Sequence, residues 1–288
     1  MRVGSVTVIG SATIDRIEQS RSTTVKMGGV VVYSGITFRN HGLITGAVTN
    51  VAAQDQWLLN ILRQHQVEVF NGVTPATTMF VNHVEGDDRW QEMPISAAPI
   101  TVRQVERALK GGHHVHLGPL HPADIEPGVL RLLRRSSATV SLDVQGYVRH
   151  VENSRVSCKV SDHLAEALSC STLVKAASRE LEAILGYYGM SIEEVISIYD
   201  LREAIVTAGR RGGYVATASN VVSYQAKAVE HEVDPTGAGD VFFASYLVSR
   251  IHARQSIEEA CEHAASLAAR QVEGRYIPGA LLTAPERT

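Results

Sequence analysis

Short apolar and β-branched runs recur along the chain, and each ends at a polar or glycine-containing loop. They include VTVIG near the N-terminus, HHVHLGPL, ATVSLDV, STLVKA and EAIVTAG. Segments of this length and composition are typical of buried strands. Longer stretches with a helical spacing of apolar residues lie between them, such as AAQDQWLLNILRQH (52–65), PADIEPGVLRLLRRS (122–136) and SRELEAILGYY (178–188).

The alternation of strands and helices predicts an α/β fold with a mostly parallel central sheet and helices on both faces. In such a sheet, ligands bind beyond the carboxyl ends of the strands. The sequence contains no internal repeat, low-complexity tract or linker between separable parts. We therefore predict a single domain over residues 1–288.

Two segments interrupt the alternation. Residues 12–34 include the polar stretch IEQSRSTTVKMGG, and residues 76–94 alternate on either side of EGDD as a hairpin does. We expect both segments to form a small second β-sheet, a lid over the ligand site. Phe80 and Trp90 flank the hairpin, and we interpret them as lid packing rather than ligand stacking. Because an exposed apolar lid face often pairs with its copy, we also expect a homodimer through the lid.

Composition and charge are those of an ordinary globular protein. Of the 288 residues, 44% are hydrophobic and 20% are charged, and the formal net charge is -3. Without a basic block, we expect no nucleic-acid partner. The N-terminus lacks a signal-peptide pattern, and no run approaches the roughly 18 apolar residues of a membrane span, so we expect a cytoplasmic protein without membrane contact.

Cysteines and histidines give little reason to expect a structural metal. The three cysteines are widely spaced and form no CxxC pair, which favours reduced thiols. His113, His114, His116 and His121 lie within HHVHLGPLHP, and a strand would place His114 and His116 on one face. Zinc needs three or four ligands, and no further ligand is close in sequence. We interpret these histidines as core and loop residues.

The stretch DPTGAGD, from Asp234 to Asp240, precedes the run VFFASYLVSRI, which is apolar nearly all round and predicts a buried helix. The first turn of a helix carries unpaired N–H groups, and glycines let an anion approach them. Gly237, Ala238 and Gly239 therefore predict an anion hole for a phosphoryl group. Asp240 would repel a resting phosphate, but it suits a base that takes a proton from an attacking hydroxyl.

A capped helix start with small residues would also explain the pattern Gly-Ala-Gly-Asp, because short glycine motifs are weak evidence. Other phosphate-binding signatures are missing from the sequence. No lysine follows a glycine as in a P-loop, and Phe242 occupies the third glycine position of a dinucleotide fingerprint. The interpretation therefore depends on a longer match.

The longer motif DPTGAGDVF (234–242) strongly resembles the second signature of the PfkB (ribokinase-like) family of carbohydrate kinases. GSATID (10–15), MGGVVVYSGITFRNHG (27–42), VKAASREL (174–181) and VTAGRRGG (206–213) resemble further segments of that family in the same order. The resemblance covers essentially the whole chain. It implies a Rossmann-like core with a β lid, ATP with Mg²⁺, and phosphoryl transfer to a hydroxyl or hydroxymethyl group.

The resemblance also implies which residues hold the acceptor. Asp15 would accept hydrogen bonds from two adjacent hydroxyls, which suits a carboxylate at the end of a strand. Gly28 and Gly29 would let a polyol lie on backbone N–H groups, although a turn alone also explains them. Asp143 and Gln145 end the strand ATVSLDV, and we place them along the substrate or phosphate path, with loop polarity as the simpler alternative.

On the donor side, the resemblance implies that Glu180 helps to place Mg²⁺ through water. It also implies that the ATP site is bordered by Thr207, Gly209, Gly212 and the region 264–274, which begins at Ala264. Asp240 would be the base, and the Gly-Ala-Gly segment before it would form the anion hole.

Two regions depart from the family pattern. Tyr33 and Ser34 stand near the place of a usual Asn, and Ala177 replaces the Asn three residues before Glu180. The segments SLDVQGYVR, LVKAASRELEAI and HEVDPTGAGDVF look most like the myo-inositol kinase branch, which favours a small sugar or cyclitol acceptor. A nucleoside or ribose-type kinase is the alternative within this fold. A non-catalytic ligand-binding regulatory protein is the alternative of another class.

Overall fold

The computed structural model describes residues 4–19, 22–85, 88–109 and 114–283. In this part of the chain, the central sheet has nine strands in the order β15-β14-β13-β12-β9-β8-β1-β4-β5. Neighbours from β13 to β5 are parallel, and β14 and β15 pair antiparallel at one edge. The strands are β1 (Ser5–Gly10), β4 (Ile44–Thr49), β5 (Glu68–Asn71), β8 (His114–Gly118), β9 (Thr139–Asp143), β12 (Leu173–Ala177), β13 (Glu203–Thr207), β14 (Gly213–Ala216) and β15 (Val221–Tyr224).

Strand β1 shows why the short apolar runs form a central sheet. Val6 and Val8 pack into the hydrophobic cluster on one face, and Ile9 packs into the cluster on the other face. All three side chains are almost completely buried. A parallel sheet buried on both faces needs such continuous apolar runs, so the predicted α/β class is confirmed.

Helices cover both faces of this sheet. One cluster is formed with α1 (Val30–Asn40), α2 (Trp57–Gln64), α8 (Ala238–Leu247) and α9 (Ile257–Val272). The other is formed with α3 (Val102–Ala108), α4 (Pro127–Arg134), α5 (Leu164–Ser169), α6 (Ser178–Tyr188) and α7 (Ile192–Tyr199). Helix α8 is buried along its length after the first turn, as its apolar sequence predicts.

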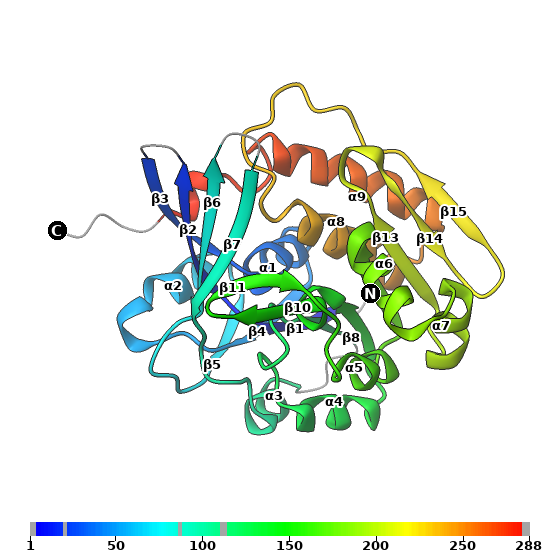
Figure 1. Ribbon diagram of the computed structural model, residues 1–288, viewed down its shortest axis with the longest axis horizontal. Coiled ribbons are helices and arrows are strands. Elements are labelled where there is room, and N and C mark those ends of the chain that lie inside the picture. Colours follow the sequence, from blue (N-terminus) through cyan, green and yellow to red (C-terminus); the bar gives the residue numbers. More distant parts are fainter. Residues whose placement is uncertain (1–3, 20–21, 86–87, 110–113, 284–288) are drawn as a thin grey trace.

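The expected second sheet is present and is larger than the sequence predicts. Its order is β10-β11-β7-β6-β2-β3, and only β2 and β6 pair in parallel. Its strands are β2 (Thr13–Gln19), β3 (Ser22–Gly28), β6 (Met79–Glu85), β7 (Asp88–Ile95), β10 (Arg149–Glu152) and β11 (Arg155–Cys158). Figure 1 shows β2, β3, β6 and β7 rising at the end of the molecule opposite β13, β14 and β15.

The β10–β11 hairpin is the part of the lid that the sequence did not predict. It joins the lid through β11 and β7. The expected turn EGDD includes residues 86 and 87, which lie outside the described residues. Among the large apolar side chains that are clearly exposed, only Ile95 belongs to the described lid strands. The apolar outer face that led us to expect a homodimer is therefore not seen there, and the dimer itself stays a prediction.

His114 and His116 lie in the core of the molecule. His114 Nε2 and His116 Nδ1 are 2.9 Å and 3.0 Å from the hydroxyl oxygen of Ser141. Burial lowers the pKa of both imidazoles, which favours their neutral forms. His121 lies beside Asp124, at 3.1 Å, and His113 lies outside the described residues. No helix in the described part of the chain combines the length and apolar character of a membrane span.

Candidate active site

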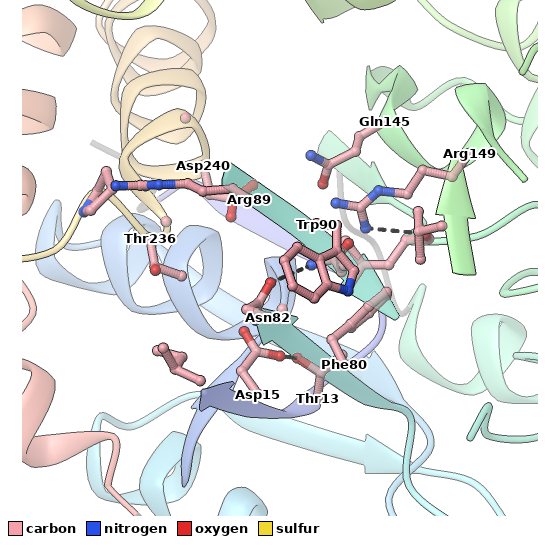
Figure 2. A pocket seen from close by; sticks show the side chains of 18 of the residues that line it. Thr13, Asp15, Phe80, Asn82, Arg89, Trp90, Gln145, Arg149, Thr236 and Asp240 are labelled. Atoms are coloured by element: carbon pink, nitrogen blue, oxygen red, sulfur yellow. Dashed lines mark hydrogen bonds between the residues drawn. The ribbon is translucent and has the colours of Figure 1, made fainter. Parts of the chain in front are cut away.

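A pocket of about 890 Å³ lies between the lid and the carboxyl-end side of the central sheet. The lid contributes Asp15, Asn82 and Trp90 to its lining, and the core contributes Lys175 and Asp240. Figure 2 shows these lid side chains and Asp240 around one hollow. This is where an α/β sheet is expected to bind its ligand.

The DPTGAGD loop leads into the start of α8 at this pocket. Gly237 is the N-cap with φ of 77°, and a Cβ there would lie 2.2 Å from the ring of Tyr33, so glycine meets both demands. Gly237 and Gly239 line the pocket. Ala238 does not, and its N–H donates to the carbonyl of Pro235 at 3.2 Å. The helix therefore presents its positive end to the pocket through the two glycines.

Asp240 lies in the first turn of α8 and also lines the pocket. Removal from water raises the pKa of Asp240 to about 7, and the charge of Asp143 acts in the same direction, against Lys175 and Arg149. A carboxylate whose pKa is near the working pH can accept a proton and release it again. The environment of Asp240 therefore suits a general base.

Asp15 occupies the lid side of the pocket on β2. Thr13 Oγ1 donates a hydrogen bond to Asp15 Oδ1 at 2.7 Å. A Cβ on Gly28 would lie 2.1 Å from Asp15 Oδ2, so this glycine leaves the space that the carboxylate fills. Burial raises the pKa of Asp15, whereas the hydrogen bond from Thr13 and the charge of Arg149 lower it. Thus the fold brings Asp15 and Asp240 to one cavity from positions far apart in sequence.

Two contacts join the lid to the loop that leads to Asp240. Lys26 on β3 forms an ion pair with Asp234, and its Nζ also donates to Thr236 Oγ1 at 3.3 Å. Gly29 has φ of 94°, and a Cβ there would lie 2.2 Å from the carbonyl oxygen of Ser11. The glycine therefore permits a close approach of two backbones just where the lid ends and α1 begins.

A buried ion pair lies beside Gly239, at the start of α8. Lys175 Nζ on β12 is 2.7 Å from Asp143 Oδ2 at the end of β9. Burial alone would lower the pKa of Lys175, but Asp143, Glu180 and Asp240 raise it above its usual value, so the ammonium stays charged. Its Nζ would lie 3.3 Å from a Cβ on Gly239. Lys175 lines the pocket and Asp143 does not, so Asp143 is placed to hold Lys175 rather than the substrate.

Gln145 and Arg149 enter the pocket from the connection that follows β9, on the side opposite Asp240 (Figure 2). The Gln145 N–H donates to Asp143 Oδ1 at 3.1 Å, which starts a short 3-10 helix over Val144–Val148. The guanidinium carbon of Arg149 lies 5.3 Å from the centre of the Phe80 ring.

The residues expected around ATP lie outside this pocket. Thr207 ends β13, Gly209 and Gly212 lie in the turn that follows, and none of the three lines this pocket. Gly209 is open to its surroundings, whereas a Cβ on Gly212 would lie 2.2 Å from the carbonyl oxygen of Tyr224. Ala264 is completely buried on α9, and the place of the region 264–274 at the ATP site stays a prediction.

Glu180 lies in the first turn of α6, which directly follows the strand that carries Lys175. Its Oε2 accepts a hydrogen bond from the Ala177 N–H at 2.7 Å. Burial raises the pKa of Glu180, and the charge of Lys175 opposes that shift. The described residues contain no group of three or more His, Cys, Asp or Glu side chains arranged to hold a metal ion. Mg²⁺ usually keeps several waters and binds one or two carboxylates with substrate phosphates, so Glu180 fits a water-mediated role.

Sequence reasoning missed the cations of the site. A signal existed for Lys175, because a lysine inside the apolar run STLVKA needs a partner if the run is a buried strand. No comparable signal marks Arg149 or Lys26. Arg149 follows a loop, and the partner of Lys26 lies 208 residues away, at Asp234.

Comparisons with known proteins show the family and the fold of the chain. The sequence profile of the pfkB family carbohydrate kinases matches residues 4–277. No curated protein sequence matches the chain significantly. A pyrophosphate-dependent kinase in the ribokinase family, solved with sulfate, has 27% identity and a TM-score of 0.82 over 95% of this chain and 96% of that chain.

Two further structures extend the comparison. A pyrophosphate-dependent kinase in the ribokinase family, complexed with a pyrophosphate analog and myo-inositol, has 27% identity and a TM-score of 0.81 over 93% of this chain and 94% of that chain. Ribokinase from Thermotoga maritima has 17% identity and a TM-score of 0.73 over 97% and 96% of the two chains, a likeness of fold alone.

Proposed function

Because the chain belongs to the pfkB family of carbohydrate kinases, we propose that it phosphorylates one hydroxyl of a small cyclitol, with myo-inositol as the favoured acceptor. The observation that carries the proposal is the shared pocket. Asp15 on the lid and Asp240 on α8 line it together, with Gly237 and Gly239 beside the base. A polyol held at Asp15 would thus lie within the same cavity as a base and an anion hole.

The lining suits a ring that carries many hydroxyl groups. Asn82 and Gln91 bring amides from β6 and β7, and Gln91 Nε2 donates to Asn82 Oδ1 at 2.8 Å. Trp90 is stacked on His83, with ring centres 4.7 Å apart, so one face of the indole is already covered. Polar groups therefore outnumber free aromatic faces on the lid, which favours a polyol over a nucleoside.

The chemistry that we assign to the site is an in-line displacement. The acceptor hydroxyl gives its proton to Asp240 as its oxygen bonds to phosphorus. The bond from phosphorus to the bridging oxygen of the donor breaks, and the leaving phosphate takes the electron pair. The N–H groups of Gly237 and Gly239 and the ammonium of Lys175 stabilise the charge on the transferring group.

We favour pyrophosphate as the donor on two observations. Two similar structures are kinases described as pyrophosphate-dependent. In this chain, the pocket that contains Asp15 and Asp240 is lined by no residue of the segment 207–212. A donor without a nucleoside needs only the phosphate contacts that this pocket supplies. ATP remains the second candidate, because the turn in that segment follows β13, which pairs with the strand carrying Lys175.

The proposal includes Mg²⁺, which would bind together with the phosphates of the donor. Glu180 would hold the ion through water, and the donor's phosphates would supply other ligands. When bound, Mg²⁺ neutralises negative charge on the donor phosphates. The contribution of the chain is to keep Glu180 oriented by the Ala177 N–H and to hold Lys175 charged.

A panel of acceptors and donors tests the proposed function. The purified protein with Mg²⁺ would be given myo-inositol, other cyclitols, hexoses, ribose and nucleosides, each with pyrophosphate or ATP, and products would be identified by mass spectrometry and ³¹P NMR. We expect myo-inositol phosphate with pyrophosphate as the better donor. Preferential phosphorylation of ribose or a nucleoside would overturn the acceptor, and turnover with ATP alone would overturn the donor. Ligand binding without turnover would support the non-catalytic alternative.

A further inference from the structure

Arg149 is a charged residue at the junction between the core and the lid. It is the first residue of β10, six positions after Asp143 at the end of β9. The short helix Val144–Val148 connects the two, so the chain passes from the central sheet into the lid just before Arg149. In Figure 2, its guanidinium group projects from this connection into the pocket.

The contacts of Arg149 leave most of its hydrogen-bonding capacity unused. Nη1 donates to the carbonyl of Leu120 at 3.2 Å, and the guanidinium carbon lies 5.3 Å from the centre of the Phe80 ring. A guanidinium carries five N–H donors in a planar fork. Among the residues that the structure describes, Leu120 is the one hydrogen-bond partner found for this side chain, and no carboxylate forms an ion pair with it.

The charges around Arg149 are negative but lie beyond direct contact. Burial lowers the pKa of Arg149, and Glu180, Asp143, Asp15 and Asp240 oppose that shift. Arg149 is part-buried, so its guanidinium has lost some of its hydration and no carboxylate contacts it in exchange. An oxyanion within the pocket would supply that missing partner, and Arg binds phosphate oxygens through two parallel hydrogen bonds.

We propose that Arg149 binds the transferring phosphoryl group from the side opposite α8. This rests on the proposed phosphoryl transfer. Gly237, Gly239 and Lys175 approach the phosphoryl oxygens from the core, and Arg149 approaches them from the lid junction. The phosphoryl group is then held between the acceptor hydroxyl, which lies beside Asp240, and the leaving phosphate of the donor. The new bond from the acceptor oxygen to phosphorus forms while the anhydride bond breaks. Because these oxygens share the charge of the transition state, Arg149 acts as a catalytic residue.

Kinetics of Arg149→Met test this role. Methionine keeps an alkyl chain against Phe80 but removes the charge and the fork of donors. We expect kcat to fall about 10²–10³-fold, as for other groups that stabilise transition-state charge. The dissociation constant of myo-inositol, measured without donor, should stay within about threefold of wild type. Arg16→Met is the matched control, because Arg16 lies on lid strand β2, is exposed, and does not line the pocket.

Rescue by added guanidinium ion distinguishes a catalytic role of Arg149 from a role in packing alone. In Arg149→Ala, added guanidinium ion should restore part of kcat, whereas it should not raise the rate of wild type or of Arg16→Met. Arg149→Lys keeps the charge and should retain more activity than Arg149→Met. It also serves as the test variant if the methionine variant does not fold. A kcat within about threefold of wild type in the folded Met variant, or a loss confined to myo-inositol binding, would overturn the proposal.

Binding of pyrophosphate alone keeps this inference separate from the proposed function. By titration calorimetry with Mg²⁺, pyrophosphate should bind Arg149→Met at least about tenfold more weakly than wild type. If wild type turns over none of the acceptors, the proposed function fails. In that case, unchanged pyrophosphate affinity in Arg149→Met would overturn the assignment of Arg149 as well.

Discussion

At the scale of single residues, the site depends on charges whose effects oppose one another. Loss of water and the charge of Asp143 raise the pKa of Asp240, and the charges of Lys175 and Arg149 partly oppose that rise. Asp143 in turn keeps Lys175 charged through the 2.7 Å ion pair. One carboxylate thus supports a cation and makes its neighbour a better base.

Replacing Asp240 by Asn tests the base directly. Asparagine keeps the volume of the side chain but cannot accept the proton, so kcat should fall about 10²–10⁴-fold. Removal of one negative charge beside the phosphates should leave donor affinity unchanged or higher. Asp162→Asn, at an exposed carboxylate, is the control. A kcat close to wild type in Asp240→Asn at saturating substrates would contradict the assignment.

The pKa of Asp240 predicts the pH profile. The active form of a general base is the ionised form, and the pKa of Asp240 is raised to about 7. Activity should therefore be lost as pH falls through about 7 and should level off above it. Plots of kcat/KM against pH for wild type should show this acidic limb, and the residual activity of Asp240→Asn should lack it. A wild-type profile that is flat from pH 5 to 8 would argue against a base with this pKa.

Asp15 should act on the acceptor rather than on the donor. In Asp15→Ala, we expect kcat/KM for myo-inositol to fall roughly ten- to hundredfold, chiefly through KM, because a charged hydrogen-bond acceptor is lost. The KM for the donor should change little. Steady-state kinetics with each substrate varied in turn gives both values. Unchanged acceptor kinetics would remove Asp15 from the site.

At the scale of elements, the start of α8 combines two demands on one glycine. Gly237 needs φ of 77°, and a side chain there would collide with Tyr33. Gly237→Ala should therefore lower the free energy of unfolding by about 1–3 kcal/mol and reduce kcat. Gly186→Ala in α6 is the matched control, since no atom lies within 4 Å of the added Cβ.

The control substitution Gly186→Ala should raise the free energy of unfolding, whereas Gly237→Ala should lower it. Gly186 lies inside a helix, where alanine is favoured over glycine by up to about 1 kcal/mol. Urea unfolding of both variants measures the two effects on one scale. Equal stability of Gly237→Ala and wild type would show that the turn does not need glycine.

Local sequence patterns predicted the helices and strands better than they predicted which distant residues contact one another. The apolar runs predicted β1, β9, β12 and β13, and the run that is apolar nearly all round predicted α8. An element that is buried on both faces needs such a continuous apolar sequence. The motif at 234–242 likewise predicted a shared site, and Gly237, Gly239 and Asp240 line one pocket. The β10–β11 hairpin has short, polar strands, so its sequence carries no such pattern.

Partners distant in sequence were the part that could not be predicted. Asp143 and Lys175 are 32 residues apart, and Lys26 and Asp234 are 208 apart. Their pairing depends on strand order, which a single sequence does not specify. For the same reason, Asp143 was expected at the substrate, whereas its carboxylate is occupied by Lys175.

At the scale of the whole molecule, the chain consists of a packed core and a lid whose Met27, Phe80 and Met93 belong to a hydrophobic cluster of the core. The nine-stranded sheet is covered by two hydrophobic clusters. The lid carries Asp15 and joins the loop 234–240 through the ion pair of Lys26 and Asp234. Asp15, which we propose holds the acceptor, and Asp240, which we propose as the base, thus belong to the lid and to the core, and the acceptor would contact both.

This division predicts where the acceptor stabilises the molecule. Saturating myo-inositol should slow amide hydrogen exchange about tenfold or more in β2, β6 and β7, because its contacts with Asp15 and Asn82 must break before the lid opens. Exchange in β14 and β15, at the far edge of the central sheet, should stay unchanged. The same ligand concentration should give much less protection in Asp15→Ala. Hydrogen exchange followed by mass spectrometry resolves these segments, and equal protection of lid and far edge would show that the lid does not close on the acceptor.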